Sequence, residues 1–371
     1  MKKIGIITFH ASKNCGSMLQ AYALQRVLNS LGCESEIIDY SGKEQRRMYS
    51  VMSFPHSLKE LMRNIYNIPF IGIIQRHYAD YEAFRCQFLN VSKASYDDLS
   101  ELSEETLGYD IYITGSDQVW NIKAQDFDDS YFLPFVNKSK KYAYAVSLGA
   151  TNITKIPNVE KYMGYINSFN GISVREYNAQ KWIAKLYSGN VEICADPTFL
   201  LNEKEWELVI GEREVEGDYI FWYTMIYRDD IRNIVVQLGK TLNLPIYVID
   251  PKEWSRRGLF LHGIKLAKND GPSSYLSMVK NAKIVITSSF HGTVFCNIFK
   301  KNFWYINIHN SQTEDDRAIF LLRQLGLSER YVTKDEILKK DVMCGPTYDN
   351  SPEMDATRKK SFDFLQKCLN D

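Results

Sequence analysis

One histidine directly follows a buried apolar run, in the stretch KIVITSSFHGTVFCNIFKKNFWYI that spans residues 283–306. Small polar residues end the run, His291 comes next, and Gly292 and Thr293 lead into an apolar segment with helical spacing. A histidine gains or loses a proton near neutral pH, so it suits general acid–base chemistry. The first turn of a helix also offers unpaired N–H groups to an anion. The pattern fits an acid–base residue beside an anion site, or a histidine that caps the helix or packs in the core.

Two further loops follow the same plan of strand, polar loop and helix. The first has an apolar strand at 4–9, a small polar loop at 10–17, a helix at about 18–31 and a second strand at 34–40. This is a βαβ unit of ordinary size. Its loop matches neither the GxGxxG fingerprint nor the Walker A phosphate loop, so nicotinamide cofactors and ATP are not indicated.

The second of these loops is YDIYITGSDQVWN, in which a strand at 110–114 opens into Gly115, Ser116 and Asp117. Taken alone, an aspartate here is more typical of a turn or a helix cap. In open α/β sheets, however, ligands bind outside the carboxyl ends of the strands. The three loops are therefore expected to lie around one site.

The motifs ITFHASKNCGSMLQAYALQ, ITGSDQVWN, ISVREYNAQ with DPTFLL, and TSSFHGTVF occur in this order over roughly residues 3–330. In this order and spacing the sequence resembles the polysaccharide pyruvyl transferase family. The resemblance implies an α/β chain of two Rossmann-like domains with mainly parallel sheets, in a GT-B-like architecture. It implies transfer of a pyruvyl group from phosphoenolpyruvate onto a sugar as a ketal. Phosphoenolpyruvate is then a co-substrate, with no cofactor and no metal expected.

The resemblance, together with the loop positions, implies a set of site residues. His291 and Arg175 are the expected catalytic residues, Arg175 as a fixed cation in SVREY at the end of a strand. A surface salt bridge with Glu176 is the alternative role for this arginine. The expected substrate-binding residues are Asn14, Gly16, Ser17, Ser116, Asp117, Ser289, Gly292, Thr293 and Arg317.

One position departs from the family pattern. Several characterised members carry an arginine two residues before the motif histidine, whereas this chain has Ser289. Phosphoenolpyruvate carries a carboxylate and a phosphate, so its site needs cations and N–H donors. The missing cation is expected to come from elsewhere, with Lys300, Lys301 and Arg317 as candidates.

Composition indicates an ordinary globular chain. The 371 residues have a formal net charge of zero, which gives no support to nucleic acid as a partner. The seven cysteines form no CxxC pair, a pattern typical of reduced thiols, so the expected location is the cytoplasm. Cys15 lies near a helix N-terminus, but no base is placed beside it, and it is expected to be a spectator.

The expected domain organisation follows the alternation of strands and helices. An N-terminal α/β domain is expected at 1–205, a C-terminal one at 216–345, and a final helix within 346–371 that crosses back to the first domain. Residues 44–107 are expected to be helical. The apolar patch IPFIGII at 68–74 is too short to span a membrane, and a buried connector is favoured over an interfacial contact with lipid.

Three functions are consistent with these patterns. The first is a pyruvyl transferase that acts on a glycan or a lipid-linked sugar of a surface polysaccharide, with peripheral association at the inner face of the membrane left open. The second is a GT-B glycosyltransferase that uses a nucleotide sugar. The third is a catalytically lapsed sugar-binding protein of the same fold, which the serine at position 289 makes conceivable.

Overall fold

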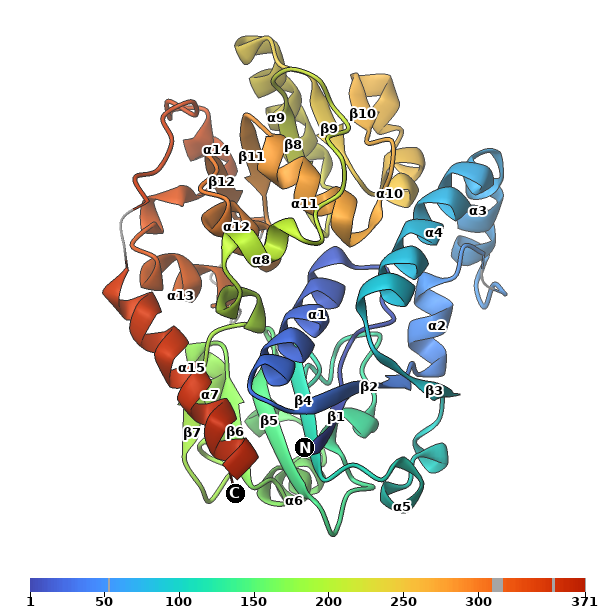
Figure 1. Ribbon diagram of the computed structural model, residues 1–371. Coiled ribbons are helices and arrows are strands. Elements are labelled where there is room, and N and C mark those ends of the chain that lie inside the picture. The colour runs from blue at the N-terminus through green and yellow to red at the C-terminus, as the bar shows by residue number, and fades with distance from the viewer. Residues whose placement is uncertain (53, 309–315, 349–350, 371) are drawn as a thin grey trace.

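Two parallel β-sheets, each covered by helices, make up the protein in a computed structural model (Figure 1). The structure describes residues 1–371 except 53, 309–315, 349–350 and 371. The two sheets lie one above the other in Figure 1, and the cores of both are built from continuous apolar strands. Strands that are buried on both faces are typical of parallel sheets with helices on either side.

The first sheet has the order β3-β2-β1-β4-β5-β6-β7, and its strand pairs are parallel. Its strands are β1 (Lys3–Ile7), β2 (Glu34–Tyr40), β3 (Val91–Tyr96), β4 (Ile111–Asp117), β5 (Lys140–Val146), β6 (Gly171–Val174) and β7 (Val191–Ile193). The strand order reverses between β1 and β4. Such a reversal opens a crevice at the carboxyl ends of the two strands.

The second sheet repeats this arrangement, in the order β10-β9-β8-β11-β12-β13. Its strands are β8 (Ile220–Tyr223), β9 (Ile246–Val248), β10 (Ile264–Leu266), β11 (Ile284–Thr287), β12 (Phe303–Ile306) and β13 (Tyr331–Val332). Here the order reverses between β8 and β11. The predicted α/β class with two mainly parallel sheets is confirmed.

The helices connect successive strands and cover both sheets. They are α1 (Cys15–Ser30), α2 (Lys43–Tyr49), α3 (Leu58–Asn67), α4 (Ile71–Phe88), α5 (Glu104–Leu107), α6 (Val159–Asn167), α7 (Tyr177–Ile183), α8 (Glu203–Glu207), α9 (Asp229–Leu242), α10 (Pro251–Arg256), α11 (Gly271–Asn281), α12 (Phe290–Ile298), α13 (Arg317–Gln324), α14 (Lys334–Ile337) and α15 (Pro352–Asn370). In the described part of the chain, no helix combines the length and the apolarity needed to cross a membrane.

Side-chain caps set the start of the two helices that matter most for the site. Asn14 accepts hydrogen bonds from the backbone N–H groups of Gly16 and Ser17, so α1 begins at Cys15 and not at the expected residue 18. Ser289 accepts from Gly292 N, so α12 begins at Phe290, one residue before His291. Asn14 lies in the loop after β1, and Ser289 lies in the loop after β11.

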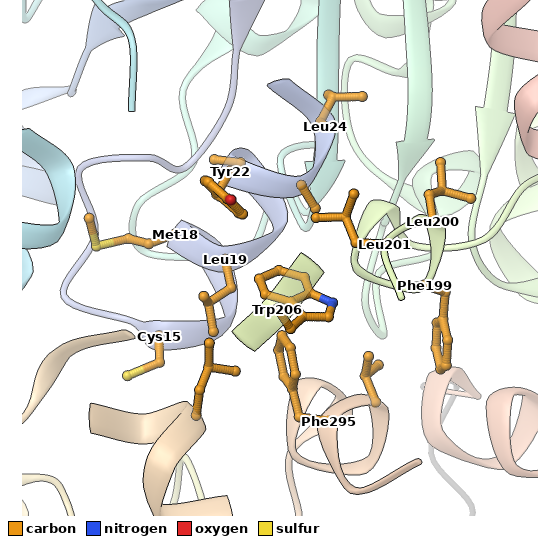
Figure 2. Close-up of a cluster of buried hydrophobic side chains, with 14 of the residues drawn as sticks. Cys15, Met18, Leu19, Tyr22, Leu24, Phe199, Leu200, Leu201, Trp206 and Phe295 are labelled. Carbon is orange, nitrogen blue, oxygen red and sulfur yellow. The ribbon is translucent and has the colours of Figure 1, made fainter. Parts of the chain in front are cut away.

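One apolar cluster joins the two sheets (Figure 2). The ring of Trp206, from α8, lies 5.7 Å from Tyr22 of α1 and 4.9 Å from Phe295 of α12. The short 3-10 helix Pro197–Leu200 adds Phe199 and Leu200 to the same cluster. Because α1 and α12 share this core, their N-termini are held at a fixed relative position.

The last helix, α15, packs beside the first sheet. Ser361 accepts a hydrogen bond from Ala195 N at 2.8 Å, and the Phe364 ring lies 6.2 Å from that of Tyr144. The N-terminal segment also contacts α15, because Lys2 Nζ donates a hydrogen bond to Leu369 O. The two ends of the described chain therefore meet at this sheet (Figure 1).

The segment 44–107 differs from its predicted helical character. It contains α2, α3 and α4, but residues 91–96 form the edge strand β3, with the polar sequence VSKASY. A lysine on an exposed edge is an ordinary protection against strand pairing. The favoured interpretation of 68–74 as a buried connector is wrong: Ile74 is buried, but Ile68 is mostly exposed.

Candidate active site

A cavity of about 230 Å³ lies where the carboxyl ends of the strands in both sheets meet, and we call it the central cavity. The loops after β1 and β4 form one wall, and the loops after β8 and β11 form the other. It is lined by Phe9, Asn14, Ser17, Tyr49, Asp117, Gln118, Ala124, Asp126, Arg175, Met225, Ile226, Ser288, Ser289, Phe290, His291, Tyr305, Ile308, Arg317 and Ala318. Both points of strand reversal thus contribute to a single site.

The structure separates the predicted site residues into two groups. Those that line the central cavity are Asn14, Ser17, Asp117, Arg175, Ser289, His291 and Arg317. The remaining four, Gly16, Ser116, Gly292 and Thr293, are packed just behind the lining. Ser116, for example, is fully buried and donates its hydroxyl to Ala145 O at 2.7 Å.

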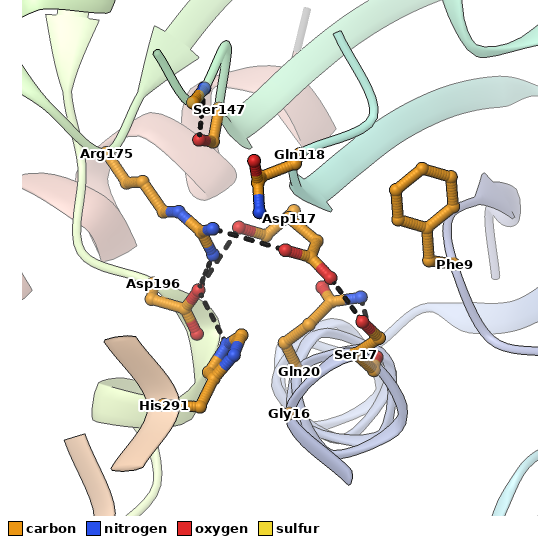
Figure 3. Close-up of polar contacts among 12 residues, drawn as sticks. Phe9, Gly16, Ser17, Gln20, Asp117, Gln118, Ser147, Arg175, Asp196 and His291 are labelled. Carbon is orange, nitrogen blue, oxygen red and sulfur yellow. Dashed lines mark hydrogen bonds and ion pairs between the residues drawn. The ribbon is translucent and has the colours of Figure 1, made fainter. Parts of the chain in front are cut away.

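A chain of buried charged groups runs along the cavity wall (Figure 3). Arg175 Nη1 donates to Asp196 Oδ2 at 2.6 Å, and Nη2 donates to Asp117 Oδ1 at 3.2 Å. The same Oδ2 atom of Asp196 lies 3.4 Å from His291 Nε2, which is within ion-pair range. On the far side of Asp117, Ser17 donates its hydroxyl to Oδ2 at 2.5 Å. His291 is thereby connected to Arg175 through one carboxylate.

Asp196 is the residue that sequence reasoning missed. It sits in the DPTFLL motif, directly after β7, and is 2% exposed. Burial alone would raise its pKa, but His291, Arg175 and Thr198 outweigh burial and hold the pKa of Asp196 below its usual range. Its position shortly after a strand is the feature of the sequence that could have marked it as a site residue. The carboxylate of Asp196 thus lies against the imidazole of His291.

Arg175 is held more tightly than a surface cation. Its side chain is 1% exposed, and its guanidinium carbon lies 4.4 Å from the centre of the Phe290 ring. The alternative role, a surface salt bridge with Glu176, is correct in the partner and wrong in the location: Arg175 Nε lies 3.8 Å from Glu176 Oε2, and both side chains are buried. Asp117 and Asp196 neutralise Arg175, and their own pKa values both lie below normal. Additional positive potential for an anion must come from other groups.

The N-terminus of α12 is one such source. Ser289 O accepts from Thr293 N at 3.1 Å, and Ser289 Oγ accepts from Gly292 N at 3.3 Å. The N–H groups of Phe290 and His291 belong to the first turn, where no preceding helical carbonyl can accept them. Both residues line the central cavity, so this turn can receive an anion.

Arg317 is the other source. It is the first residue of α13, half-buried, and lines the central cavity on the side of the second sheet. Lys300 is exposed and Lys301 is half-buried, and neither lines this cavity. Of the three cations considered as replacements for the arginine missing at position 289, the geometry favours Arg317. Within the described ranges, no group of three or more His, Cys, Asp or Glu side chains is arranged to hold a metal ion.

Asp126 is a second acid at the site that the sequence analysis did not single out. It is half-buried, lines the central cavity, and has its pKa raised to about 6 by burial, with Asp117 adding to the effect. A carboxyl group that titrates near pH 6 can exchange protons efficiently at neutral pH. Cys15, by contrast, is buried against Tyr81, and burial raises the pKa of its thiol well above normal. Its expected role as a spectator agrees with this environment.

Glu176 gives a prediction for the dependence of stability on pH. Burial raises its pKa from 4.5 to about 7, against the opposing effect of Arg175. Between these two values the folded protein binds more protons than the unfolded chain, so stability falls as pH rises. We expect wild-type protein to lose on the order of a few kcal/mol of unfolding free energy between pH 4.5 and 7 relative to Glu176→Gln. Urea denaturation across this range measures it, with exposed Glu105→Gln as the control. Parallel pH profiles for wild type and Glu176→Gln would contradict the assignment.

Gly16 gives a prediction for the position of His291. A Cβ atom at Gly16 would lie 2.2 Å from His291 Nδ1, so Gly16→Ala must displace the imidazole. A shift of about 1 Å at a reacting group can cost on the order of 100-fold in rate, and we expect a loss of that size in kcat. The control is Gly72→Ala in α4, where an added Cβ meets nothing within 4 Å and activity should not change. Equal activity of both variants in a steady-state assay would show that the imidazole position is unimportant.

Comparison with solved structures identifies the fold. The protein is similar to UDP-GlcNAc 2-epimerase from Methanocaldococcus jannaschii in complex with UDP-GlcNAc and UDP, with a TM-score of 0.57, 11% identity and 100% of each chain covered. It is also similar to a putative UDP-N-acetylglucosamine 2-epimerase from Listeria monocytogenes, with a TM-score of 0.56, 9% identity, and coverage of 99% of this chain and 95% of that one. At such low identity the likeness shows a GT-B-like fold and nothing about chemistry.

Sequence comparison is more specific. A search of curated proteins gives no significant match. The family model described as polysaccharide pyruvyl transferase matches residues 14–310, which include the loop of Asn14, the carboxylate–arginine cluster and the whole of α12. The match thus covers most of the chain and most of the residues that line the central cavity, while Phe9, Arg317 and Ala318 lie outside it. The chain therefore belongs to the polysaccharide pyruvyl transferase family.

Proposed function

We propose that the central cavity transfers a pyruvyl group from phosphoenolpyruvate to a sugar hydroxyl pair as a cyclic ketal. The observation that carries the proposal is His291, paired with a buried carboxylate and placed on the first turn of α12, in a chain of this family. An acid–base group and an anion site are thereby combined in one loop. The acceptor is a glycan or a lipid-linked sugar of a surface polysaccharide, and the reaction takes place in the cytoplasm.

The donor needs anion contacts for its phosphate and its carboxylate. The first-turn N–H groups of α12 and the guanidinium of Arg317 supply them from one wall of the cavity. Arg175 presents a fixed, already neutralised guanidinium beside them, and Asn14 and Ser17 belong to the opposite wall. The arrangement replaces the arginine missing at position 289 by an arginine from a different helix.

The chemistry requires three proton transfers, one to the donor and one from each sugar hydroxyl. A proton goes to the methylene carbon of phosphoenolpyruvate, the C2 centre becomes electrophilic, and one sugar hydroxyl adds there and releases its proton. The second hydroxyl then displaces the phosphate, which leaves with the other proton. His291, held by Asp196, suits the first donation, and Asp126 suits the acceptance of a hydroxyl proton at a pH above about 6.

Arg317 gives a prediction for donor affinity. The loss of a hydrogen bond to a charged group costs about 1.5–3 kcal/mol, so Arg317→Ala should weaken phosphoenolpyruvate binding about 10- to 100-fold. Arg323→Ala in the same helix is the control, since that side chain is exposed and does not line the cavity. Calorimetric titration with phosphoenolpyruvate measures both. If Arg317→Ala binds the donor as tightly as Arg323→Ala does, the donor cation is not Arg317.

A ligand comparison tests the proposal against its alternatives. A ligand that binds only the folded state raises the melting temperature by mass action. Phosphoenolpyruvate should raise the melting temperature of the wild-type protein, whereas UDP-GlcNAc should not. A shift with the nucleotide sugar alone would favour a GT-B glycosyltransferase. Binding of sugar acceptors with no response to either donor would favour a lapsed sugar-binding protein.

A further inference from the structure

Two buried polar side chains beside one cavity carry an oxygen atom that has no hydrogen-bond partner among the described residues. Asn67, the last residue of α3, is 3% exposed, and its amide oxygen is unpartnered. Tyr227, in the loop between β8 and α9, is 1% exposed, and its hydroxyl is unpartnered as well. A polar group that is buried without a hydrogen bond costs free energy, so both groups call for an explanation.

Both side chains line a second cavity of about 450 Å³, which we call the side cavity. It lies between α3 and α4 on one side and α10 on the other, and these helices are neighbours in Figure 1. Asn14, Tyr49 and Met225 line the side cavity and the central cavity alike, so the two spaces adjoin. A ligand in the side cavity can therefore extend toward the candidate active site.

Helix α3 turns its amide side chains toward the side cavity. Asn64 and Asn67 are buried and line it, whereas Ile65 and Tyr66, which lie between them in the sequence, are exposed. A surface helix normally places its apolar stripe inward and its polar residues outward. The reversed orientation of α3 places hydrogen-bonding groups, in place of apolar ones, at the wall of the cavity.

Tyrosine rings form much of the remaining wall. They come from both halves of the chain and are Tyr49, Tyr78, Tyr81, Tyr223 and Tyr227. The ring of Tyr78 lies 6.4 Å from that of Tyr81, and Lys252 Nζ lies 4.9 Å from the centre of the Tyr78 ring. Small-molecule sites are typically lined by aromatic side chains with a few polar groups that fix the orientation of the ligand. The apolar face of a tyrosine ring suits the C–H face of a sugar ring.

The charged side chains of the side cavity are nearly balanced. The cations are Lys13, Arg63, Lys252 and Arg256, and the acids are Asp250, Glu253 and Asp270. Lys13 is already paired with Glu82, and Arg256 is paired with Glu253. Such a lining does not favour a multiply charged anion such as a nucleoside diphosphate. It suits the hydroxyl groups of a neutral sugar, since each hydroxyl both donates and accepts hydrogen bonds.

We propose that the side cavity is the acceptor subsite and takes a neutral hexopyranose unit, whose hydroxyl groups bind the amide of Asn67 and the hydroxyl of Tyr227. The sugar ring packs on the tyrosine faces, and its reacting hydroxyl pair lies at the junction with the central cavity. The binding of a sugar follows from the lining of the cavity. Its role as acceptor rests on the proposed function. The free-energy cost of the two unpartnered oxygens is offset when the sugar binds.

The double variant Asn67→Leu/Tyr227→Phe tests the assignment, because neither substitution breaks a hydrogen bond made by these two oxygens. Its melting temperature should be no lower than that of wild type. It should bind sugar at least about tenfold more weakly, since each lost hydrogen bond to a ligand costs about two- to tenfold in affinity. Saturation-transfer NMR measures the binding of the methyl glycosides of glucose, galactose, mannose and N-acetylglucosamine.

The matched control is Tyr131→Phe. The hydroxyl of Tyr131 is likewise buried and unpartnered, but Tyr131 lines neither the central cavity nor the side cavity. Tyr131→Phe should therefore bind the glycosides as wild type does. Equal weakening in Tyr131→Phe and in the double variant would show that the effect does not arise in the side cavity, and would overturn the proposal.

The sugar measurement needs no phosphoenolpyruvate, so its outcome is separate from that of the proposed reaction. Wild-type protein that binds none of the four glycosides would overturn the proposal, as would a double variant that binds them as tightly as wild type. Displacement of a bound glycoside by UDP would assign the side cavity to a nucleotide instead. In turnover, the double variant should raise the KM of the acceptor and leave that of phosphoenolpyruvate unchanged. Sugar binding without any turnover would contradict only the transfer reaction.

Discussion

The substitution His291→Ala is expected to lower turnover about 10²- to 10⁴-fold, the usual cost of removing one positioned proton-transfer group. The imidazole lies at the central cavity, against Asp196 and on the first turn of α12, and no other histidine lines this cavity within the described residues. Loss of the ring removes the proton donor but leaves the anion contacts of the helix in place. The measurement is the rate of phosphate release from phosphoenolpyruvate at saturating donor and acceptor.

The matched variant is His291→Gln, which keeps a hydrogen-bonding side chain of similar size. An amide cannot transfer a proton in this pH range, so His291→Gln should be nearly as inactive as His291→Ala. Both variants should still bind phosphoenolpyruvate, because the backbone N–H groups remain. Near-wild-type turnover by His291→Gln would mean that His291 only orients a ligand or caps the helix, and that another residue such as Asp126 moves the proton.

Arg175→Ala is expected to cost about 3–5 kcal/mol of unfolding free energy, which is typical when one partner of a buried ion pair is removed. Asp117 and Asp196 accept hydrogen bonds from this guanidinium at 3.2 and 2.6 Å, and both carboxylates are buried. Removal of the arginine leaves two buried carboxylates without the cation that they share. Urea denaturation at neutral pH measures the change.

The control for this prediction is Lys138→Ala, which breaks an exposed pair with Glu105 and should change stability by less than about 1 kcal/mol. A similarly small effect of Arg175→Ala would show that the cluster is solvated. Arg175→Lys separates packing from donor contact, because it keeps the charge but loses the forked geometry. If Arg175→Lys and Arg175→Ala both bind phosphoenolpyruvate as wild type does, Arg175 is a structural residue and not a donor contact.

The alternation of apolar strands and helices predicted most of the architecture. The sequence pattern predicts a helix at 229–242 and a strand at 303–306, and the structure has the helix Asp229–Leu242, which Asn243 ends in the left-handed conformation, and the strand Phe303–Ile306. The edge strand β3 was missed because its side chains are polar and half exposed, so the two-residue periodicity of a strand is weak there. Tertiary pairing with β2 determines its structure.

The sequence predicts the site residues that lie in loops after strands. It does not predict the residues whose role depends on partners far away in the sequence. The placement of Asn14, Asp117 and His291 around one cavity follows from the parallel topology. The pairing of Asp196 with both Arg175 and His291 depends on side-chain packing between segments far apart in the chain. Likewise, the sequence shows that α3 is amphipathic but not that its polar face points inward.

The most direct test of the account is incubation of the protein with phosphoenolpyruvate and a panel of hexosides that carry suitably spaced hydroxyl pairs. Phosphorus NMR follows the release of inorganic phosphate, and mass spectrometry follows the sugar. Phosphate should appear in step with a sugar product heavier by one pyruvic acid less one water, and His291→Ala should abolish both signals. Phosphate release without a modified sugar, or sugar transfer from UDP-GlcNAc instead, would contradict pyruvyl transfer at this site.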